Sequence, residues 1–482
     1  MISPVFITGQ AGTGRTTRLM DLTGEYGSRL VAHEYQRILA MTLMHGARRR
    51  VEASLDKHEQ CRTLRRSVST IDSFALSLVN RWRSSLGIAL PIDASQQSGS
   101  PRVEKHFRTH THFADIVQLA LQVLTRVDAR KYVSDTYPVI LVDEFQDVHG
   151  DRLAFIQTLA VLSQLLLAAD AFQLLDTNIV GCPAIEWIAE LEGRGEVIVE
   201  NLIKPRRTAN PQILEAARCL REKRQGGPAV PVFFGAEAQI AFRIVDHLVF
   251  NWYAPRWTGT CAIISPVRSG LIDRVLASID SQLRKRNFQP IHWTQNTSED
   301  HDEVAILEAL GLKIQNQPSE GAWVPRQLQK DARAIEITKQ VQQFAKLRGL
   351  TTIPCDLVAL FARKYAHTHR SYGHASSWRV ATTVHGAKNR EFDHVFVLWP
   401  YNVRSDQEQQ RRLLYNAVTR AKKECIIFSG KRESVARADE VLSLLGPVQS
   451  LSPPRQAKGT KTTKVKRSGG KVAKLQQGQL SL

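Results

Sequence analysis

The chain has 482 residues, 43% of them hydrophobic, and a formal net charge of +19 from 65 basic and 46 acidic residues; this length predicts about three domains. No apolar run approaches the roughly 20 residues of a membrane span, and the first ten residues lack a signal-peptide pattern. The six cysteines are scattered without a CxxC pair, which argues against a zinc or iron–sulfur site and predicts a cytoplasmic protein.

The first 200 residues alternate strand and helix patterns, which predicts a parallel α/β domain. Apolar runs predict strands at 5–8, 29–32, 38–42, 68–71, 139–142 and 165–169. Helices are predicted from about residue 16, over 47–55 and over 74–82. Residues 85–132 interrupt the alternation and are predicted to form a small insertion.

A second α/β domain is predicted over 201–446. Its strand candidates are 261–265, 394–399 and 425–428, and the polar, helix-forming stretch 297–371 is predicted to be a helical insertion. From residue 447 the Lys-, Gly-, Thr- and Gln-rich composition cannot form a core and predicts a disordered basic tail, 447–482. The basic excess favours a polyanionic partner, with solubility as the competing explanation.

A glycine-rich turn follows the first predicted strand and opens a helix. Its sequence, GQAGTGRT, resembles the phosphate-binding pattern GxxxxGK[ST]. Glycines let backbone N–H groups close around phosphates, and the helix N-terminus adds positive potential. The predicted nucleotide-binding residues are Gly9, Gln10, Ala11, Gly12, Thr13, Gly14, Arg15, Thr16 and Thr17. Arg15 replaces the usual lysine, which keeps the charge and changes the geometry.

Two acids, Asp143 and Glu144, end the apolar strand at 139–142 within the string DEFQD. Carboxyl ends of parallel strands are where ligands bind in open α/β sheets. We expect Asp143 and Thr16 to hold Mg²⁺ and Glu144 to act as general base or water-positioning group toward a nucleoside triphosphate.

The string DEFQD resembles motif II of the UvrD/Rep-like superfamily 1 helicases, and further segments resemble other motifs of this family in order. These segments are 40–47 (motif Ia), 69–74 (TxHSF, with Asp72 for His), 169–173 (motif III), 204–208 (motif IV, with Arg206 for Tyr), 383–392 (motif V, with Asn389 for Gly) and 411–421 (motif VI). The resemblance implies an α/β fold of two RecA-like P-loop parallel-sheet domains with small helical insertions.

The resemblance also implies the function: an ATP-dependent 3′–5′ DNA helicase or translocase in DNA repair, replication or phage defence. It implies that Gln173 senses the γ-phosphate, that Arg207 and Arg420 are arginine fingers, and that Glu391 contacts the ribose. The competing explanations are a solvated charge for Arg207 and a surface salt bridge for Arg420.

Contacts to single-stranded DNA follow from the same resemblance. Backbone phosphates would be contacted by Thr42, Thr70, Thr383 and His385, and Phe74 would stack on a base. The competing explanations are ordinary strand ends for Thr42 and Thr70 and a core position for Phe74.

Two features leave other functions open. The Gln-containing adenine motif of the family is missing before Gly9, and Arg206 replaces the adenine-stacking tyrosine. Together with Arg15, these departures favour, as an alternative, a nucleotide-gated DNA-binding protein or regulatory subunit with weakened ATPase activity. Motifs V and VI argue against an unrelated P-loop kinase or ATPase.

Partner proteins are predicted from the tail and the size. The last four residues, 479–482, have the sequence QLSL and resemble the peptide by which bacterial proteins bind the sliding clamp. The chain shows no RecB-like nuclease segment, and its size is similar to that of compact helicases that work with a nuclease or other protein partner, as in Gabija-type phage-defence pairs.

Overall fold

The computed structural model describes residues 3–43, 45–95, 103–105, 108–226, 230–253, 259–267, 270–295, 306–312, 322–324, 331–373, 378–400, 403, 405–430 and 432–451. The compact unit that contains the described residues ends at Leu451. The predicted disordered tail and its terminal QLSL therefore lie outside the described residues, except at 447–451. This stretch belongs to the fold, because its β16 strand pairs with the second sheet and Val448 and Leu451 are buried.

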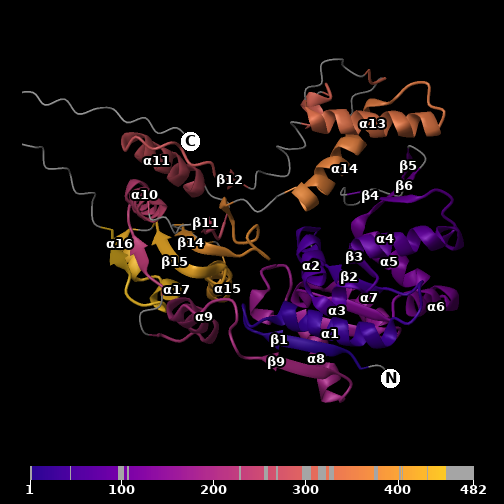
Figure 1. Ribbon diagram of the computed structural model, residues 1–482, viewed down its shortest axis with the longest axis horizontal. Coiled ribbons are helices and arrows are strands. Elements are labelled where there is room, and N and C mark those ends of the chain that lie inside the picture. The colour runs from indigo at the N-terminus through magenta and orange to yellow at the C-terminus, as the bar shows by residue number, and fades with distance from the viewer. Residues whose placement is uncertain are drawn as a thin grey trace, which may run out of the picture. The chain divides into compact units, whose positions relative to one another are not determined.

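The first sheet has six strands in the order β3-β2-β7-β8-β1-β9, all parallel (Figure 1). Its strands are β1 (Val5–Gly9), β2 (Ile38–Thr42), β3 (Arg66–Thr70), β7 (Val139–Val142), β8 (Gln164–Ala169) and β9 (Ile198–Leu202). Helices α1 (Arg15–Leu30), α2 (His45–Lys57), α3 (Glu59–Arg62), α4 (Ile71–Trp82), α5 (Phe113–Val123), α6 (Val127–Thr136), α7 (Gly150–Ala160) and α8 (Pro183–Gly193) accompany it.

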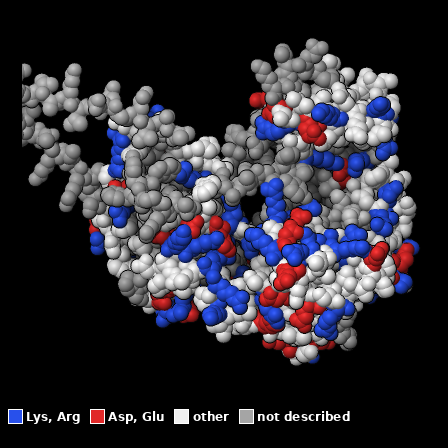
Figure 2. All heavy atoms as spheres, viewed as in Figure 1, with Lys and Arg blue, Asp and Glu red and all other residues white. Residues whose placement is uncertain are grey.

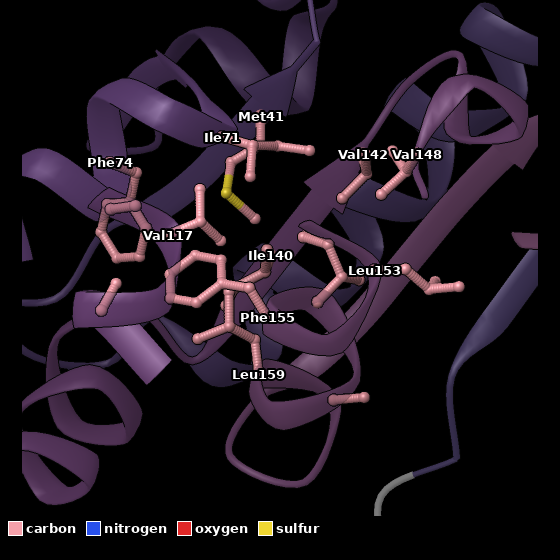
Figure 3. Close-up of a cluster of buried hydrophobic side chains, with 14 of the residues drawn as sticks. Met41, Ile71, Phe74, Val117, Ile140, Val142, Val148, Leu153, Phe155 and Leu159 are labelled. Atoms are coloured by element: carbon pink, nitrogen blue, oxygen red, sulfur yellow. The ribbon is translucent and has the colours of Figure 1, made fainter. Parts of the chain in front are cut away.

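Both faces of the first sheet are covered. In β1, Phe6 faces one apolar cluster while Val5 and Ile7 face another, as strand alternation requires. Figure 3 shows part of the first cluster, in which Met41 and Ile140 lie beside Phe155. Burial on both sides explains why the central strands are continuous apolar runs, and these are the strands that the sequence predicts most accurately.

Two predictions for the first half need correction. Residues 29–32 are not a strand, because α1 continues to Leu30. The stretch 85–132 is not one insertion: α5 and α6 contribute to the same core as β7. The inserted part has a three-stranded sheet, β4 (Ile92–Ser95), β5 (Val103–Lys105) and β6 (Arg108–His112), in the order β4-β6-β5. This insertion is therefore built from strands rather than helices.

The second sheet has seven parallel strands in the order β12-β13-β11-β14-β15-β10-β16. They are β10 (Val232–Phe234), β11 (Cys261–Ser265), β12 (Thr294–Gln295), β13 (Arg379–Thr383), β14 (Phe392–Trp399), β15 (Ala421–Ser429) and β16 (Gln449–Ser450). Helices α9 (Pro211–Glu222), α10 (Glu237–Tyr253), α11 (Leu271–Lys285), α15 (Gln407–Val418), α16 (Glu433–Arg437) and α17 (Glu440–Ser443) accompany it. Two apolar clusters again cover the two faces. The pair of parallel sheets confirms the predicted fold class of two RecA-like domains.

Within the predicted helical insertion at 297–371, the structure describes α13 (Ala332–Leu347) and α14 (Cys355–Gly373). The two helices share a small core of their own with residues 306–312 and Trp323. Lys364 on α14 forms an ion pair with Asp93 on β4, so this insertion touches the strand insertion of the first half. Among the described residues, no helix is both long enough and apolar enough to span a membrane.

Candidate functional site

The phosphate loop lies between β1 and α1. Gly12 and Gly14 have φ angles of 81° and 92°, a left-handed conformation that glycine adopts without strain. Thr13 donates its backbone N–H and its hydroxyl to Gln10 O, at 3.2 and 2.9 Å, which closes the turn. The loop therefore places the N-terminus of a 16-residue helix at the end of β1, as phosphate binding requires. Thr17 lies in the first turn of α1 with its side chain exposed.

Arg15 bends back over this loop. Its guanidinium donates to Gly9 O and forms an ion pair with Asp170 Oδ2 at 3.2 Å. Burial lowers its pKa, but Asp170 and then Glu144 outweigh this and hold the pKa of Arg15 above its usual value. The arginine that replaces the usual lysine is thus fully charged, and in the structure it has protein acceptors.

The two acids of motif II lie at the end of β7, both buried. Asp143 Oδ2 accepts a hydrogen bond from Thr16 Oγ1 at 3.4 Å, so the two predicted Mg²⁺ ligands meet. Both offer hard oxygen donors, the type that Mg²⁺ prefers, and one or two protein ligands plus phosphates and water are its usual set. The residues present therefore fit the metal.

Glu144 adopts a left-handed backbone with a φ of 56°. For a residue with a side chain this costs of order 1–3 kcal/mol and is often found at functional sites. Its carboxylate accepts from Gln146 Nε2 at 2.7 Å. Burial raises its pKa, but Lys388, Arg15 and Arg50 outweigh that effect and lower the pKa of Glu144 to about 2. Glu144 is thus an anionic hydrogen-bond acceptor throughout the neutral range.

Arg50, on α2, is a site residue that the sequence patterns did not identify. It donates to Thr16 Oγ1 at 3.0 Å, lies 3.9 Å from Asp143 Oδ2, and also donates to Asn389 Oδ1 at 3.1 Å. A protein cation therefore lies against the two oxygens predicted to hold Mg²⁺. The run of three arginines at 48–50, directly after motif Ia, was the available signal.

Motif III supplies a buried acid that joins the two halves of the chain. Asp170 accepts from Arg221 at 2.7 Å, from Gln173 Nε2 at 2.9 Å and from the Tyr415 hydroxyl at 3.3 Å, besides pairing with Arg15. Burial raises its pKa, yet Arg15 and Arg221 lower the pKa of Asp170 below its ordinary value. Asp170 is thus an ionised centre within a network of cations and a hydroxyl.

Gln173 extends this network to the second half. Its Oε1 accepts from Arg420 Nη2 at 3.2 Å, and Arg420 also donates to Asn416 O at 3.0 Å. Arg420 is only 2% exposed, so the competing explanation of a surface salt bridge is wrong. Burial, followed by the neighbouring charge of Arg207, lowers the pKa of Arg420 to about 9.

Arg207 lies against the phosphate loop rather than in solvent. Its backbone N–H donates to Gly12 O at 3.0 Å, and a Cβ placed on Gly12 would come within 2.8 Å of Arg207 Cβ. Its guanidinium donates to Thr419 O at 2.9 Å and pairs with Glu391 Oε1 at 2.8 Å. Lys422 also contacts Glu391, at 3.3 Å. The glutamate expected at the ribose is thus held between two cations.

Two departures from the family motifs have a structural explanation. Asp72, in place of histidine, accepts two hydrogen bonds from Arg152, at 2.7 and 3.0 Å, and so ties α4 to α7. Asn389, in place of glycine, has a φ of 66°, a conformation that asparagine tolerates better than most residues. Its side chain is the one that accepts from Arg50.

The residues predicted to contact nucleic acid differ in how exposed they are. Thr42 and Thr70 lie opposite each other at the ends of neighbouring strands, but they are only 1% and 2% exposed. The Thr70 hydroxyl caps α4, because it accepts from Ser73 N at 3.1 Å. In the second half, His385 is exposed and Thr383, at the end of β13, is half-buried. The two buried threonines do not present their hydroxyls at the surface.

Phe74 is a core residue, as its competing explanation proposed. It is 4% exposed and packs against Tyr137 and Phe155, with ring centroids at 5.4 and 6.1 Å. Figure 3 shows its ring pointing into the apolar cluster. The prediction that Phe74 stacks on a base is therefore wrong for this structure, because helix α4 turns the ring inward.

Surface charge does not mark one dominant groove on the face drawn in Figure 2. Lys and Arg side chains are spread over it in small groups, with Asp and Glu between them. On this face the basic side chains thus lie at many separate positions, which suits contacts to a phosphate backbone at several points.

Comparisons with known proteins give two family matches. An AAA domain matches residues 2–178, and a UvrD-like helicase C-terminal domain matches residues 380–428. No curated protein matches the chain. One solved structure that matches is arterivirus nonstructural protein 10, a helicase in complex with DNA, at 10% identity and a TM-score of 0.30. The match covers 90% of this chain and 62% of that one, so the chain spans less than two thirds of that helicase.

Proposed function

Because the chain belongs to the UvrD/Rep-like helicases, as its two domain matches show, we propose that it hydrolyses ATP to move 3′→5′ on single-stranded DNA. The observation that carries this proposal is a set of arginines that joins the two parallel sheets at the phosphate loop. Arg207 and Arg420 both follow the last strand of the first sheet in sequence. Arg207 contacts Gly12, and Arg420 contacts Gln173. Phosphoryl transfer is catalysed mainly by cations placed around the transferred group.

Each residue of this site has a proposed role. Backbone N–H groups of 9–16 bind the phosphates, Arg15, Arg207 and Arg420 neutralise charge that develops on the γ-phosphoryl group, and Glu144 orients the attacking water. Thr16 and Asp143 would hold Mg²⁺, which when bound neutralises the β- and γ-phosphate oxygens. With a pKa of about 2, Glu144 is a weak base, so its main contribution is to accept a hydrogen bond from the water.

Coupling to DNA is proposed to run through Asp170 and Gln173. Both lie directly after β8, and they connect the phosphate loop with Tyr415 and Arg420. A γ-phosphate that attracts Arg15 or Arg420 competes with these acceptors and so changes how the two halves hold each other. Differential contacts of this kind are what a ligand-driven cycle needs.

The decisive experiment measures ATP hydrolysis with and without single-stranded DNA. We expect DNA to stimulate wild-type hydrolysis and Glu144→Gln to reduce it by about 10²-fold or more, since a neutral amide replaces the carboxylate charge that would hold and polarise the attacking water. Glu192→Gln, at an exposed acid on α8, is the matched control and should behave as wild type. If Glu144→Gln hydrolyses ATP at the wild-type rate, the proposal is wrong.

Direction is tested separately. On oligonucleotides with a streptavidin block, 3′→5′ movement predicts faster displacement from the 5′ end than from the 3′ end. The same substrates made of RNA test the preference for DNA. The opposite bias in displacement would overturn the polarity while leaving ATP hydrolysis in place.

The alternative, a nucleotide-gated DNA-binding or regulatory subunit with weakened ATPase, is favoured by one observation. Arg15, at the position of the usual P-loop lysine, donates to Gly9 O and pairs with Asp170, and these contacts compete with binding to a phosphate. Arg15→Lys distinguishes the two functions. A large gain in turnover would favour the weakened enzyme, whereas a loss would show that Arg15 is the working residue of an active motor.

Partners and pathway are proposals that rest on sequence alone. We propose that residues 479–482 bind the sliding clamp and that a nuclease or other protein accompanies the chain in DNA repair, replication or phage defence. A pull-down with purified clamp, repeated after deletion of 479–482, tests the first; equal capture by both chains would refute it.

A further inference from the structure

A compact group of metal-binding side chains lies on the second sheet, away from the phosphate loop. It consists of His247 on α10, His394 on β14 and Glu424 on β15. The parallel register of β14 and β15 places His394 directly beside Glu424. Helix α10 covers this face of the sheet, and His247 follows Ile244 by one turn on the helix face that packs in the core. Three separate elements thus bring the group together.

The distances suit coordination of one ion. Glu424 Oε2 lies 3.0 Å from His247 Nε2 and 3.2 Å from His394 Nδ1, and the ligand atoms of all three residues lie within 4.8 Å of one another. For bonds of about 2.0–2.1 Å, a tetrahedral zinc ion separates its ligand atoms by about 3.3 Å. The two separations between the carboxylate and the imidazoles therefore lie close to the value that a zinc ion requires.

The surroundings hold the ligands in place and leave one side open. The histidine side chains are 16% and 11% exposed, and the His247 ring contacts Phe396 edge-on at a centroid distance of 5.3 Å. Glu424 is 40% exposed, which gives an ion a route of entry and room for a water ligand. Three protein ligands plus water is the arrangement of open zinc sites.

The donor types select the kind of ion. Two imidazole nitrogens and one carboxylate suit Zn²⁺ and its transition-metal neighbours, whereas Mg²⁺ and Ca²⁺ prefer sites made of oxygen alone. We propose that His247, His394 and Glu424 bind a divalent transition-metal ion of the zinc class. Cysteine spacing argues against a cysteine-based zinc site, and this group uses no cysteine.

The position of the group suggests what the ion would do. Glu391 directly precedes β14 and Arg420 directly precedes β15, and Phe392 N donates to Arg420 O at 2.9 Å. An ion bound a few residues further along both strands, and also to α10, would fix the starts of the strands that carry these two nucleotide-site residues. Its role would thus be structural, and it is independent of whether the chain hydrolyses ATP.

The test uses the full chain, purified without a metal-affinity tag and stripped with chelator. Titration with Co²⁺, followed by visible absorption, should give one ion per chain with the intense bands of low-coordinate cobalt, and Zn²⁺ should displace it. Zn²⁺ should also raise the melting temperature, and Mg²⁺ at the same concentration should not reproduce this. Mutation of groups that only hydrogen-bond to metal ligands typically lowers metal affinity by about 10–100-fold. Removal of a ligand itself, in His394→Ala or Glu424→Gln, should therefore weaken Co²⁺ binding at least about 100-fold.

His33→Ala, at an exposed histidine of the first half, is the control and should bind as wild type. Glu424→Gln keeps the size and hydrogen-bonding capacity of the side chain, so it gives an answer even if His394→Ala does not fold. Absence of Co²⁺ uptake by the wild type, or equal uptake by wild type and Glu424→Gln, would overturn the proposal.

Discussion

Replacement of Arg420 by methionine tests the central arginine of the site. Arg420 is 2% exposed, and its pKa falls from the usual arginine value to about 9 because burial and then Arg207 disfavour its charge. At about 1.36 kcal/mol per pKa unit, this amounts to a cost on the order of 4–5 kcal/mol for holding the charged form. Hydrogen bonds to Gln173 and Asn416 offset part of it, since a bond from a charged donor contributes about 1.5–3 kcal/mol.

The sign of the effect follows from proton linkage. Because the folded-state pKa is lower than that of the unfolded chain, the cost is fully present below about pH 9 and would be relieved only as pH rises from there toward the pKa of arginine in the unfolded chain. At neutral pH, methionine removes the cost and fills a similar volume. We therefore expect Arg420→Met to unfold at an equal or higher temperature than wild type when no nucleotide is added, since such replacements are often neutral or stabilising by about 1–4 kcal/mol.

Bound nucleotide should make the melting temperature of wild type higher than that of Arg420→Met. A non-hydrolysable ATP analogue with Mg²⁺ should raise the melting temperature of wild type clearly and that of Arg420→Met little, and the variant's kcat for ATP should fall by about 10³-fold. Arg420→Lys keeps a charge without the planar fork and should recover part of the nucleotide effect. Arg432→Met, at an exposed arginine, is the control. A strong loss of stability in Arg420→Met alone, with unchanged ATP hydrolysis, would refute the reasoning.

Two further predictions concern the metal position. Arg50→Gln should lower ATP hydrolysis about tenfold or more, because the contact to Thr16 is lost; the exposed neighbour Arg49→Gln is the control, and equal rates for the two variants would exclude a role for Arg50. Burial and then Glu144 raise the pKa of Asp143, so its carboxyl keeps a proton in the folded chain at pH values where the unfolded chain has lost it. The stabilisation of the folded chain that comes from this more tightly bound proton is lost as pH rises from about 3.8 through the folded-state pKa of Asp143. Protons and Mg²⁺ then compete for Asp143, and the Mg²⁺ concentration for half-maximal ATP hydrolysis should rise as pH is lowered toward the folded-state pKa of Asp143; a concentration that stays constant down to the lowest pH at which the protein remains folded would contradict this.

The parts of the fold that local sequence determines were predictable. Strands β2 and β11 have the predicted bounds, because continuous apolar runs between polar turns form buried strands in few other ways. The strand predicted at 29–32 failed because α1 continues to Leu30, which is an exposed position of this helix and not a buried strand residue. Helical and strand patterns cannot be separated over so short a run.

The candidate site was predictable where a motif fixes a position and not where the fold brings distant side chains together. Gly9 to Thr16 and Asp143 meet as expected, because they follow β1 and β7, two strands of the same parallel sheet that are separated only by β8. Arg50 and Arg221 reach the site from helix surfaces: the arginine run at 48–50 did not show which of its members would do so, and the local sequence of Arg221 does not distinguish it from a solvated arginine. Phe74 illustrates the converse: its motif position predicts a base contact, but the helix phase buries it.

The cations of the site are shared between the protein and any bound phosphate. Arg15 pairs with Asp170, Arg207 with Glu391, and Arg420 donates to Gln173. A γ-phosphate therefore competes with these protein acceptors for the three guanidinium groups, so part of its binding free energy is spent on weakening existing contacts. Of the three contacts, the one between Arg420 and Gln173 joins the second half to the first sheet. Its exchange at the moment of phosphate binding or release would alter the connection between the halves, and this is how we propose that ATP hydrolysis is coupled to movement along DNA.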